Sequence, residues 1–307
     1  MASVDQRAVA APVIAEAERG FAQVRPVGSQ DRADVFLRLL AYVVLVLVAL
    51  IMFVPFAYAV ATSFKTRPEA LQISFETMLW PRNPTLEAYR IAWDANVGRW
   101  FLNSVVVALV WIVGRIVSCS MAGYAFARMR FPGRDLVFLL VVSTMMVPGI
   151  VTIIPKFILL QDLKLLNTYG ALTVPFLADG FAIFLMKQFF ESFPNEIEEA
   201  ARVDGANRFQ IFSQIVVPNA IPAITALTIF TFQSSWNAFL EPLIFISGNR
   251  SDLFTLPVGL ANFKGAYYTD QPTLMAMSVI TTVPIAIFFI VFQRYFIESS
   301  TSSAVKG

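Results

Sequence analysis

Long apolar runs separated by short polar segments dominate the chain after residue 35. A membrane-spanning helix needs about 20 consecutive apolar residues, and six runs reach that length. The pattern predicts an all-α fold, a polytopic membrane helix bundle with about six transmembrane helices. The predicted spans are residues 39–64, 101–127, 136–155, about 165–186, 218 to about 245, and 271–293.

The polar segments predict three parts of the chain. Residues 1–35 are rich in Ala, Arg and acidic residues, which is typical of a disordered leader. Residues 36–298 form the transmembrane domain, and within it residues 191–218 are a charged insert between the fourth and fifth spans. Residues 299–307 are a small, polar C-terminal tail. The first span is longer than the apolar core of a signal peptide and follows a polar leader, so we expect it to be retained.

Composition narrows the function classes. Of the 307 residues, 57% are hydrophobic and 14% charged, against about 25% charged in soluble domains. A net charge of +2 gives no electrostatic support for a nucleic-acid partner. With no His and one Cys, the chain lacks the means for His-based catalysis, the usual zinc sites and an internal disulfide. We therefore predict no catalytic residues and no metal site, and we expect Cys119 to be a small buried hydrophobe.

The distribution of Lys and Arg orients the predicted spans. These residues are in excess on the side that holds both termini and residues 191–218. The positive-inside rule places that side in the cytoplasm. We therefore expect a multi-pass membrane protein with both termini cytoplasmic.

The charged insert begins with a predicted short helix. Asn195 is a good N-cap, and Glu198 stands where a capping box places its reaching side chain. Glu198 and Arg202 are spaced i, i+4 in the favourable order. Gly205 is a natural C-terminal stop.

A second short helix is predicted after that glycine. Asn207 is its cap, with Gln210 three residues later, and the helix must end or kink near Pro218. Two interpretations remain open on local chemistry alone. The insert is either a docking surface for a soluble protein or an amphipathic loop helix lying on the membrane.

The spacing of residues in the insert resembles a known signature. Glu199-Ala200-Ala201, Gly205 after three intervening residues, and Ile215-x-x-Pro218 after nine more resemble the signature of permease subunits in binding-protein-dependent ABC importers. Val217 stands where that family usually has Leu. The resemblance covers about residues 39–307.

Further motifs are similar to the carbohydrate branch of that family, and within it to the maltose-permease type. They are Asn103-Ser104, Gly123-Tyr124-Ala125-Phe126-Ala127-Arg128, Arg130-Phe131-Pro132-Gly133, Trp236-Asn237, Thr255-Leu256-Pro257-Val258-Gly259-Leu260, and the terminal Val305-Lys306-Gly307.

The resemblance implies a set of partners. The signature would form a coupling helix seated in a cleft of an ATPase, through Glu199, Ala200, Ala201, Asp204, Gly205, Ile215 and Pro218. A second homologous permease subunit, two ATPase subunits and an extracytoplasmic sugar-binding protein would complete the importer. ATP and Mg would bind to the partner ATPase, because this chain has no Gly-x-x-x-x-Gly-Lys-Ser/Thr loop and so no cofactor of its own. The tail (Ser303, Val305, Lys306, Gly307) would insert between the two ATPases; the alternative is a frayed terminus.

Polar residues inside the predicted spans are candidates for function. An unpaired charge in the membrane is costly, so Arg115 and Asp179, at similar depth, are predicted to pair; the alternative is that Arg115 meets the partner subunit. A sugar is held by hydrogen bonds and aromatic stacking, so a substrate path is predicted along Gln233, Trp236, Asn237 and Glu241. The alternative role of such polar residues is to hold helices together.

Three rival classes fit less well. An ion-coupled secondary transporter of a polar solute would be expected to show internal repeats, and only Asp179 and Glu241 could serve as its ion sites. A membrane enzyme would need a nucleophile or metal motif, and this sequence has neither. A channel does not need the charged insert.

Overall fold

The structure is a computed structural model that describes residues 32–72, 78–266 and 270–304. Every regular element in these ranges is a helix, which confirms the predicted all-α class. The chain divides into two units, residues 1–57 and residues 58–307. The predicted leader lies outside the described residues except for residues 32–35, and residues 305–307 of the predicted tail also lie outside them.

Among the described residues, three helices are long and apolar enough to cross a membrane. The described part of the first unit is the portion of helix α2 (Arg32–Ser63) up to residue 57. Helix α2 contains Pro55, and its residues Val35–Ser63 are a candidate span. In the second unit the candidates are α5 (Val97–Arg128) and residues Gln271–Gln293 of α16 (Gln271–Ala304). Helix α16 continues through residues 299–304, so part of the predicted polar tail is helical.

Three further candidate spans in the described ranges are bent pairs of helices. The first pair joins α6 (Arg134–Thr144) to η1 (Gly149–Thr152) and α7 (Ile153–Asp162), with a bend of 99°. The second joins α8 (Tyr169–Thr173) and η2 (Val174–Phe176) to α9 (Gly180–Ser192), with a bend of 41°. The third joins α11 (Arg208–Gln210), η3 (Ile211–Val216) and α12 (Val217–Asn219) to α13 (Ile221–Trp236), with a bend of 76°. If each bent pair is one span, the described chain has the six that the sequence predicts.

The fifth predicted span was too long. Helix α13 ends at Trp236, and Glu241 belongs to a separate short helix, α14 (Leu240–Phe245). Asn237 closes α13: its backbone N–H and its side-chain amide both donate to the carbonyl of Gln233. The apolar run continues past this cap, which is why hydropathy alone does not locate the end of the helix.

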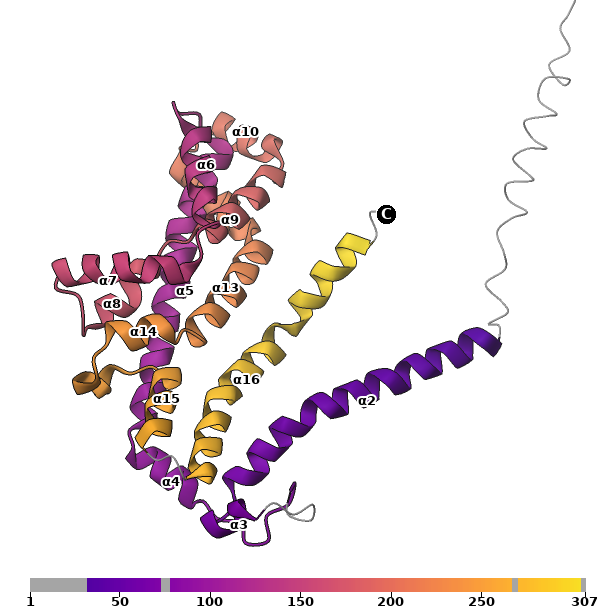
Figure 1. Cartoon of the computed structure of the whole chain (residues 1–307). Helices are drawn as coiled ribbons and strands as arrows, with labels where there is room; N and C mark the ends of the chain where they lie inside the picture. The colour runs from indigo at the N-terminus through magenta and orange to yellow at the C-terminus, as the bar shows by residue number, and fades with distance from the viewer. Residues whose placement is uncertain (1–31, 73–77, 267–269, 305–307) are drawn as a thin grey trace, which may run out of the picture. The chain divides into compact units, whose positions relative to one another are not determined.

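Helix α5 organises the second unit. It packs along α9 and α13 (Figure 1). One apolar cluster surrounds the N-terminal part of α5 and includes Trp100, Trp111 and Trp236. A second surrounds the C-terminal part and includes Tyr124 and Phe190. The remaining short helices are α3 (Arg67–Leu71), α4 (Glu87–Asp94), α10 (Asn195–Val203), η4 (Gly248–Leu253) and α15 (Leu256–Ala266).

Candidate functional site

The insert folds as two short helices joined by a tight reversal. Helix α10 ends at Val203, and Gly205 follows with φ +86°. The N–H of Ala206 donates to the carbonyl of Ala201 at 2.9 Å, and the N–H of Gly205 donates to that of Arg202 at 3.1 Å. This pair of bonds is a Schellman motif, and its left-handed position favours glycine. Gly205 therefore stops α10 as the sequence predicts.

The second helix carries the predicted capping box. The Asn207 side chain accepts from the N–H of Gln210 at 2.9 Å, and the Gln210 side chain accepts from the N–H of Asn207 at 2.8 Å. The helix widens to π geometry in η3 and reaches Asn219 through Pro218 before the 76° bend. Proline has no N–H to donate, and a widened turn is a usual response to a disturbed hydrogen-bond ladder.

The predicted cap of the first helix was wrong. Pro194 occupies the N-cap position, and Asn195 is the first helical residue. The Asn195 side-chain oxygen instead accepts a hydrogen bond from the guanidinium of Arg128 at the end of α5. A charged donor from another helix outcompetes the local backbone N–H. Glu198 does not reach back to the cap either.

Glu198 is buried in a charged network that joins α10 to α5. The residue is 2% exposed. Its carboxylate accepts from the Tyr124 hydroxyl at 3.1 Å and lies 3.1 Å from Arg128 Nε and 3.5 Å from Arg202 Nη2. Arg128 also donates to the carbonyl of Phe193. A carboxylate this deeply buried requires such compensation.

An apolar cluster lies under the same helices. Ala201, Ile211 and Val216 are buried there together with Tyr124 and Phe190. Ala201, which the resemblance places in the coupling surface, therefore faces inward at 8% exposure. It contributes to the attachment of α10.

The opposite face of the two helices is exposed. Val203 is 88% and Phe209 69% exposed, so apolar surface stands among charged groups. Of the other predicted coupling residues, Ile215 is half-buried and the rest are exposed: Glu199, Ala200, Asp204, Gly205 and Pro218. The combination of buried anchors and an exposed mixed surface suits a segment that binds another protein.

The other end of α5 holds a second set of the motif residues. The Asn103 side-chain amide donates to the carbonyls of Asp252 and Phe254, each at 2.8 Å. The Ser104 hydroxyl accepts from the N–H of Leu256 at 2.8 Å. These bonds fix the start of α15. On the same loop, the hydrogen bond from Arg250 lowers the pKa of the Asp252 carboxyl.

The segment that runs from α8 through η2 to the start of α9 presents backbone carbonyls to α5. Polar side chains spaced i, i+4 and i+7 on one face of α5 donate to them: Trp111 Nε1 to Leu172 O at 2.7 Å, Arg115 Nε to Phe176 O at 2.9 Å, and Ser118 Oγ to Leu177 O at 2.6 Å. Freed backbone groups inside a membrane must be satisfied in this way.

The two intramembrane charges lie close together. Arg115 Nη2 is 3.6 Å from Asp179 Oδ2, while Asp179 Oδ1 caps α9 by accepting from the N–H of Ala182 at 3.0 Å. Arg115 is 7% exposed. Arg115 therefore binds both the Phe176 carbonyl and the Asp179 carboxylate, whereas the sequence predicted only the pair with Asp179.

We expect Arg115→Leu to destabilise the chain more than Asp179→Asn. Leucine leaves the Phe176 carbonyl without a donor, which costs about 1–3 kcal/mol. Asparagine retains a side-chain oxygen that can cap α9, so its cost should stay near 1 kcal/mol. Unfolding in detergent measures both. Equal losses would mean that the ion pair, and not the bond to the backbone, dominates.

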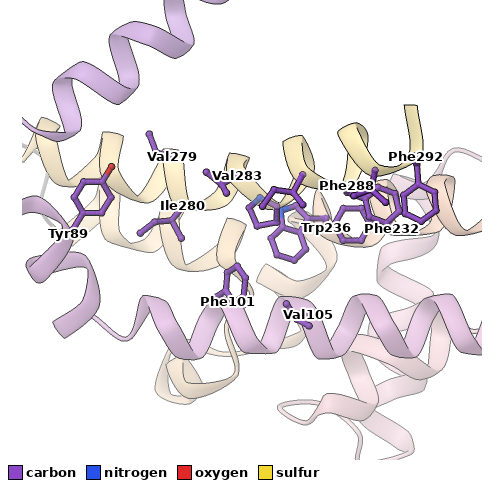
Figure 2. Close-up of a pocket in the computed structure, with 13 residues that line it drawn as sticks. Tyr89, Phe101, Val105, Phe232, Trp236, Val279, Ile280, Val283, Phe288 and Phe292 are labelled. Atoms are coloured by element: carbon purple, nitrogen blue, oxygen red, sulfur yellow. The ribbon is translucent and has the colours of Figure 1, made fainter. Parts of the chain in front are cut away.

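The predicted substrate-path residues do not form one surface. Gln233 and Asn237 are exposed, whereas Trp236 is 1% exposed and donates to the Thr281 carbonyl at 3.0 Å. Figure 2 shows Trp236 among aromatic and aliphatic side chains from α5, α13 and α16, in a pocket of about 620 Å³. Glu241 pairs with Lys156 of α7 at 2.9 Å.

Sequence reasoning missed the residues that attach the insert. Tyr124 and Arg128 appeared only as parts of a motif, and Glu198 as a cap and as the i, i+4 partner of Arg202, of which only the pair is confirmed. Tyr124 is 74 positions from Glu198, so only the fold brings them together. In the part of the chain that the structure describes, no group of three or more His, Cys, Asp or Glu could hold a metal ion.

Comparison with known proteins places the chain in a family. Residues 119–299 match the family model described as "Binding-protein-dependent transport system inner membrane component". The chain is 37% identical over 262 residues to the arabinooligosaccharides transport system permease protein AraQ of Halalkalibacterium halodurans, covering 85% of this chain and 93% of that protein. It is 30% identical to the trehalose/maltose transport system permease protein MalG of Thermococcus litoralis, over 90% and 99% of the two chains.

A solved structure gives the same result. A chain of a bacterial ABC transporter involved in the import of the acidic polysaccharide alginate superposes with a TM-score of 0.77 at 25% identity. The match covers 88% of this chain and all of that one. These comparisons confirm the resemblance drawn from the signature and favour it over an ion-coupled carrier. The chain belongs to the binding-protein-dependent transport system inner membrane components, the membrane permeases of ABC importers.

Proposed function

We propose that this chain is a transmembrane permease subunit of an ATP-driven sugar importer. It would pair with a second homologous permease subunit, form the translocation path with it, and dock an ATPase through residues 195–219. Two ATPase subunits would carry ATP and Mg, and an extracytoplasmic binding protein would deliver the sugar. Segment 195–219 and both termini would then lie in the cytoplasm.

The observation that carries this proposal is the attachment of α10 to α5. Movement imposed on the exposed face of α10 would pass through the Glu198 carboxylate to Arg128 and Tyr124. Both of these residues belong to α5, a helix long enough to cross the membrane. A displacement at the ATPase would thus reach the membrane interior through a rigid connection.

Sugars are the proposed substrate class because of the relatives. Their names specify arabinooligosaccharides, diacetylchitobiose, lactose, and trehalose or maltose. In this chain, exposed Gln233 and Asn237 remain the candidates for hydrogen bonds to a passing sugar. The Glu241–Lys156 pair, whose side chains are 23% and 29% exposed, is a further polar element of the proposed path.

The tail is proposed as a second ATPase contact. Ser303 lies on the helical continuation of α16, and Val305, Lys306 and Gly307 lie outside the described residues. A helix that extends beyond the membrane span would carry the chain's end toward the ATPases.

Two substitutions on the docking surface, one that reverses a charge and one that strains the backbone, test the proposal. We expect Glu199→Lys and Gly205→Arg to reduce ATP-driven sugar uptake by about tenfold or more, because like-charge contact at an interface costs several kcal/mol and arginine is strained at φ +86°. The assay is uptake into proteoliposomes that contain the whole importer, together with ATPase co-purification.

The matched control is Glu87→Lys in the first turn of α4, an exposed reversal beside the other end of α5. It should leave uptake and co-purification unchanged. All variants should reach the membrane in normal amounts. Normal ATP-coupled uptake by both test variants would refute the docking assignment.

A further inference from the structure

An arginine-lined cavity opens beside α10. Its volume is about 580 Å³. Five arginines and two glutamates line it: Arg128, Arg130, Arg134, Arg202, Arg208, Glu198 and Glu199. The excess of guanidinium groups over carboxylates makes the cavity a site for an anion.

The carboxylates in and beside the cavity do not neutralise all of its positive charge. Glu198 is shared by Arg128 and Arg202, and Arg134 pairs with Asp135 at 2.8 Å. The guanidinium groups of Arg130 and Arg208 make no hydrogen bond or ion pair with any residue that the structure describes. Both are exposed to solvent. Guanidinium groups in this state are suited to phosphate, which they bind through paired hydrogen bonds.

The cavity lies where a membrane span meets the polar boundary. Arg128 is the last residue of α5, and Arg134 is the first residue of α6. No residue of α6 is buried, and four of its apolar side chains are exposed: Leu136 and Leu139, each at 62%, with Val137 and Leu140. An apolar helix with such a surface is suited to contact acyl chains, and the arginines at its end would then lie at the level of the headgroups.

We propose that this cavity binds the phosphate headgroup of an anionic phospholipid. Arg130 and Arg208 hold the phosphate, Arg134 adds charge at the rim, and the acyl chains lie along the exposed face of α6. The bound lipid then contacts the base of α10 and stabilises its seat on α5. This inference goes beyond the proposed function, since it concerns the bilayer and requires neither a sugar nor an ATPase.

The test is lipid binding by the full-length chain. The chain is purified in detergent and titrated with phosphatidylglycerol or phosphatidylcholine, and retained lipid is measured by native mass spectrometry. We expect preferential retention of phosphatidylglycerol, with each of Arg130→Gln and Arg208→Gln weakening it about fivefold, because one arginine contributes about 1 kcal/mol at an anionic surface. The double variant should lose the preference.

The matched control removes two charges elsewhere. Arg90→Gln with Lys164→Gln changes two exposed cations outside the cavity and should keep the preference. Equal loss in the control, or full retention in the double variant, would overturn the proposal. Inorganic phosphate distinguishes the source: if millimolar phosphate displaces phosphatidylglycerol completely, the cavity is a free-phosphate site and the lipid assignment is wrong.

Discussion

Glu198→Ala is expected to destabilise the chain by about 3–5 kcal/mol and to release α10 from α5. The variant leaves the Arg128 guanidinium, whose side chain is 11% exposed, without its carboxylate. It also removes the acceptor of the Tyr124 hydroxyl. Removing one partner of a buried ion pair costs more than the pair contributes, because the remaining charge cannot be rehydrated.

Glu198→Gln should be the milder change. Glutamine can still accept from the Tyr124 hydroxyl, but it supplies no charge for Arg128 and Arg202. We therefore expect Glu198→Gln to reduce the free energy of unfolding, but by less than Glu198→Ala does. This ordering separates the contribution of the charge from that of the hydrogen bond.

Unfolding in detergent and trypsin digestion measure the two effects. Release of α10 should speed cleavage after Arg202 and Arg208, which flank the Gly205 reversal. The control is Glu196→Ala, an exposed glutamate in the first turn of the same helix. The control should lose only about 0.3–1 kcal/mol of unfolding free energy, from the weakened interaction with the helix dipole. If the control matches Glu198→Ala in both measurements, the network does not hold α10.

The Glu198 variants also address how the proposed importer is driven. If α10 passes movement to α5 through the network, Glu198→Ala should impair uptake more than ATPase docking. Glu199→Lys should impair docking itself. Comparing ATPase co-purification with uptake in the two variants distinguishes a broken connection from a lost surface.

Much of the fold could be predicted because the membrane imposes it. Apolar run lengths predict the spans, and the Asn207 capping box and the Gly205 stop are local signals that the structure confirms. One failure is local and the other is tertiary. Hydropathy continued past the cap at Asn237, and Arg128 took the Asn195 side chain away from its expected cap.

The site was predicted less completely because its contacts are tertiary. The signature predicts where the insert lies and which partner it suits, but not that Ala201 faces inward or that Glu198 is buried. One signal was available: Trp111, Arg115 and Ser118 share a face of α5, opposite a span that contains Pro175. A polar stripe beside a proline-interrupted span indicates hydrogen bonds to freed carbonyls.

Gly123→Ala is expected to force α5 and α9 apart. A Cβ at this position would lie 2.8 Å from Met186 Cβ and 2.9 Å from the backbone nitrogen of Lys187. These are backbone-level contacts, so a rotamer change cannot relieve them and α9 must move as a whole. Overpacking of this kind costs about 1–3 kcal/mol. Because Tyr124 and Phe190 lie in the adjoining cluster, the shift should also loosen α10.

Gly114 supplies the matched comparison on the same helix. A Cβ there would lie 2.4 Å from Leu177 Cδ2, the tip of a side chain, and 3.4 Å from Leu177 Cβ. We expect Leu177→Ala to relieve the clash of Gly114→Ala, apart from the ordinary cost of the lost side chain. Met186→Ala should not rescue Gly123→Ala, because alanine keeps the offending Cβ. A double-mutant cycle on unfolding free energy in detergent measures both couplings.

The coupling free energies of the two cycles should therefore differ in size. Gly114 and Leu177 should show a favourable coupling, whereas Gly123 and Met186 should show almost none. Rescue at Gly123 would mean that α9 contacts α5 through side chains alone. In that case the close approach of α5 and α9 would not be the interaction that positions the end of α5. The alignment of Tyr124 and Arg128 with Glu198 would then have another cause.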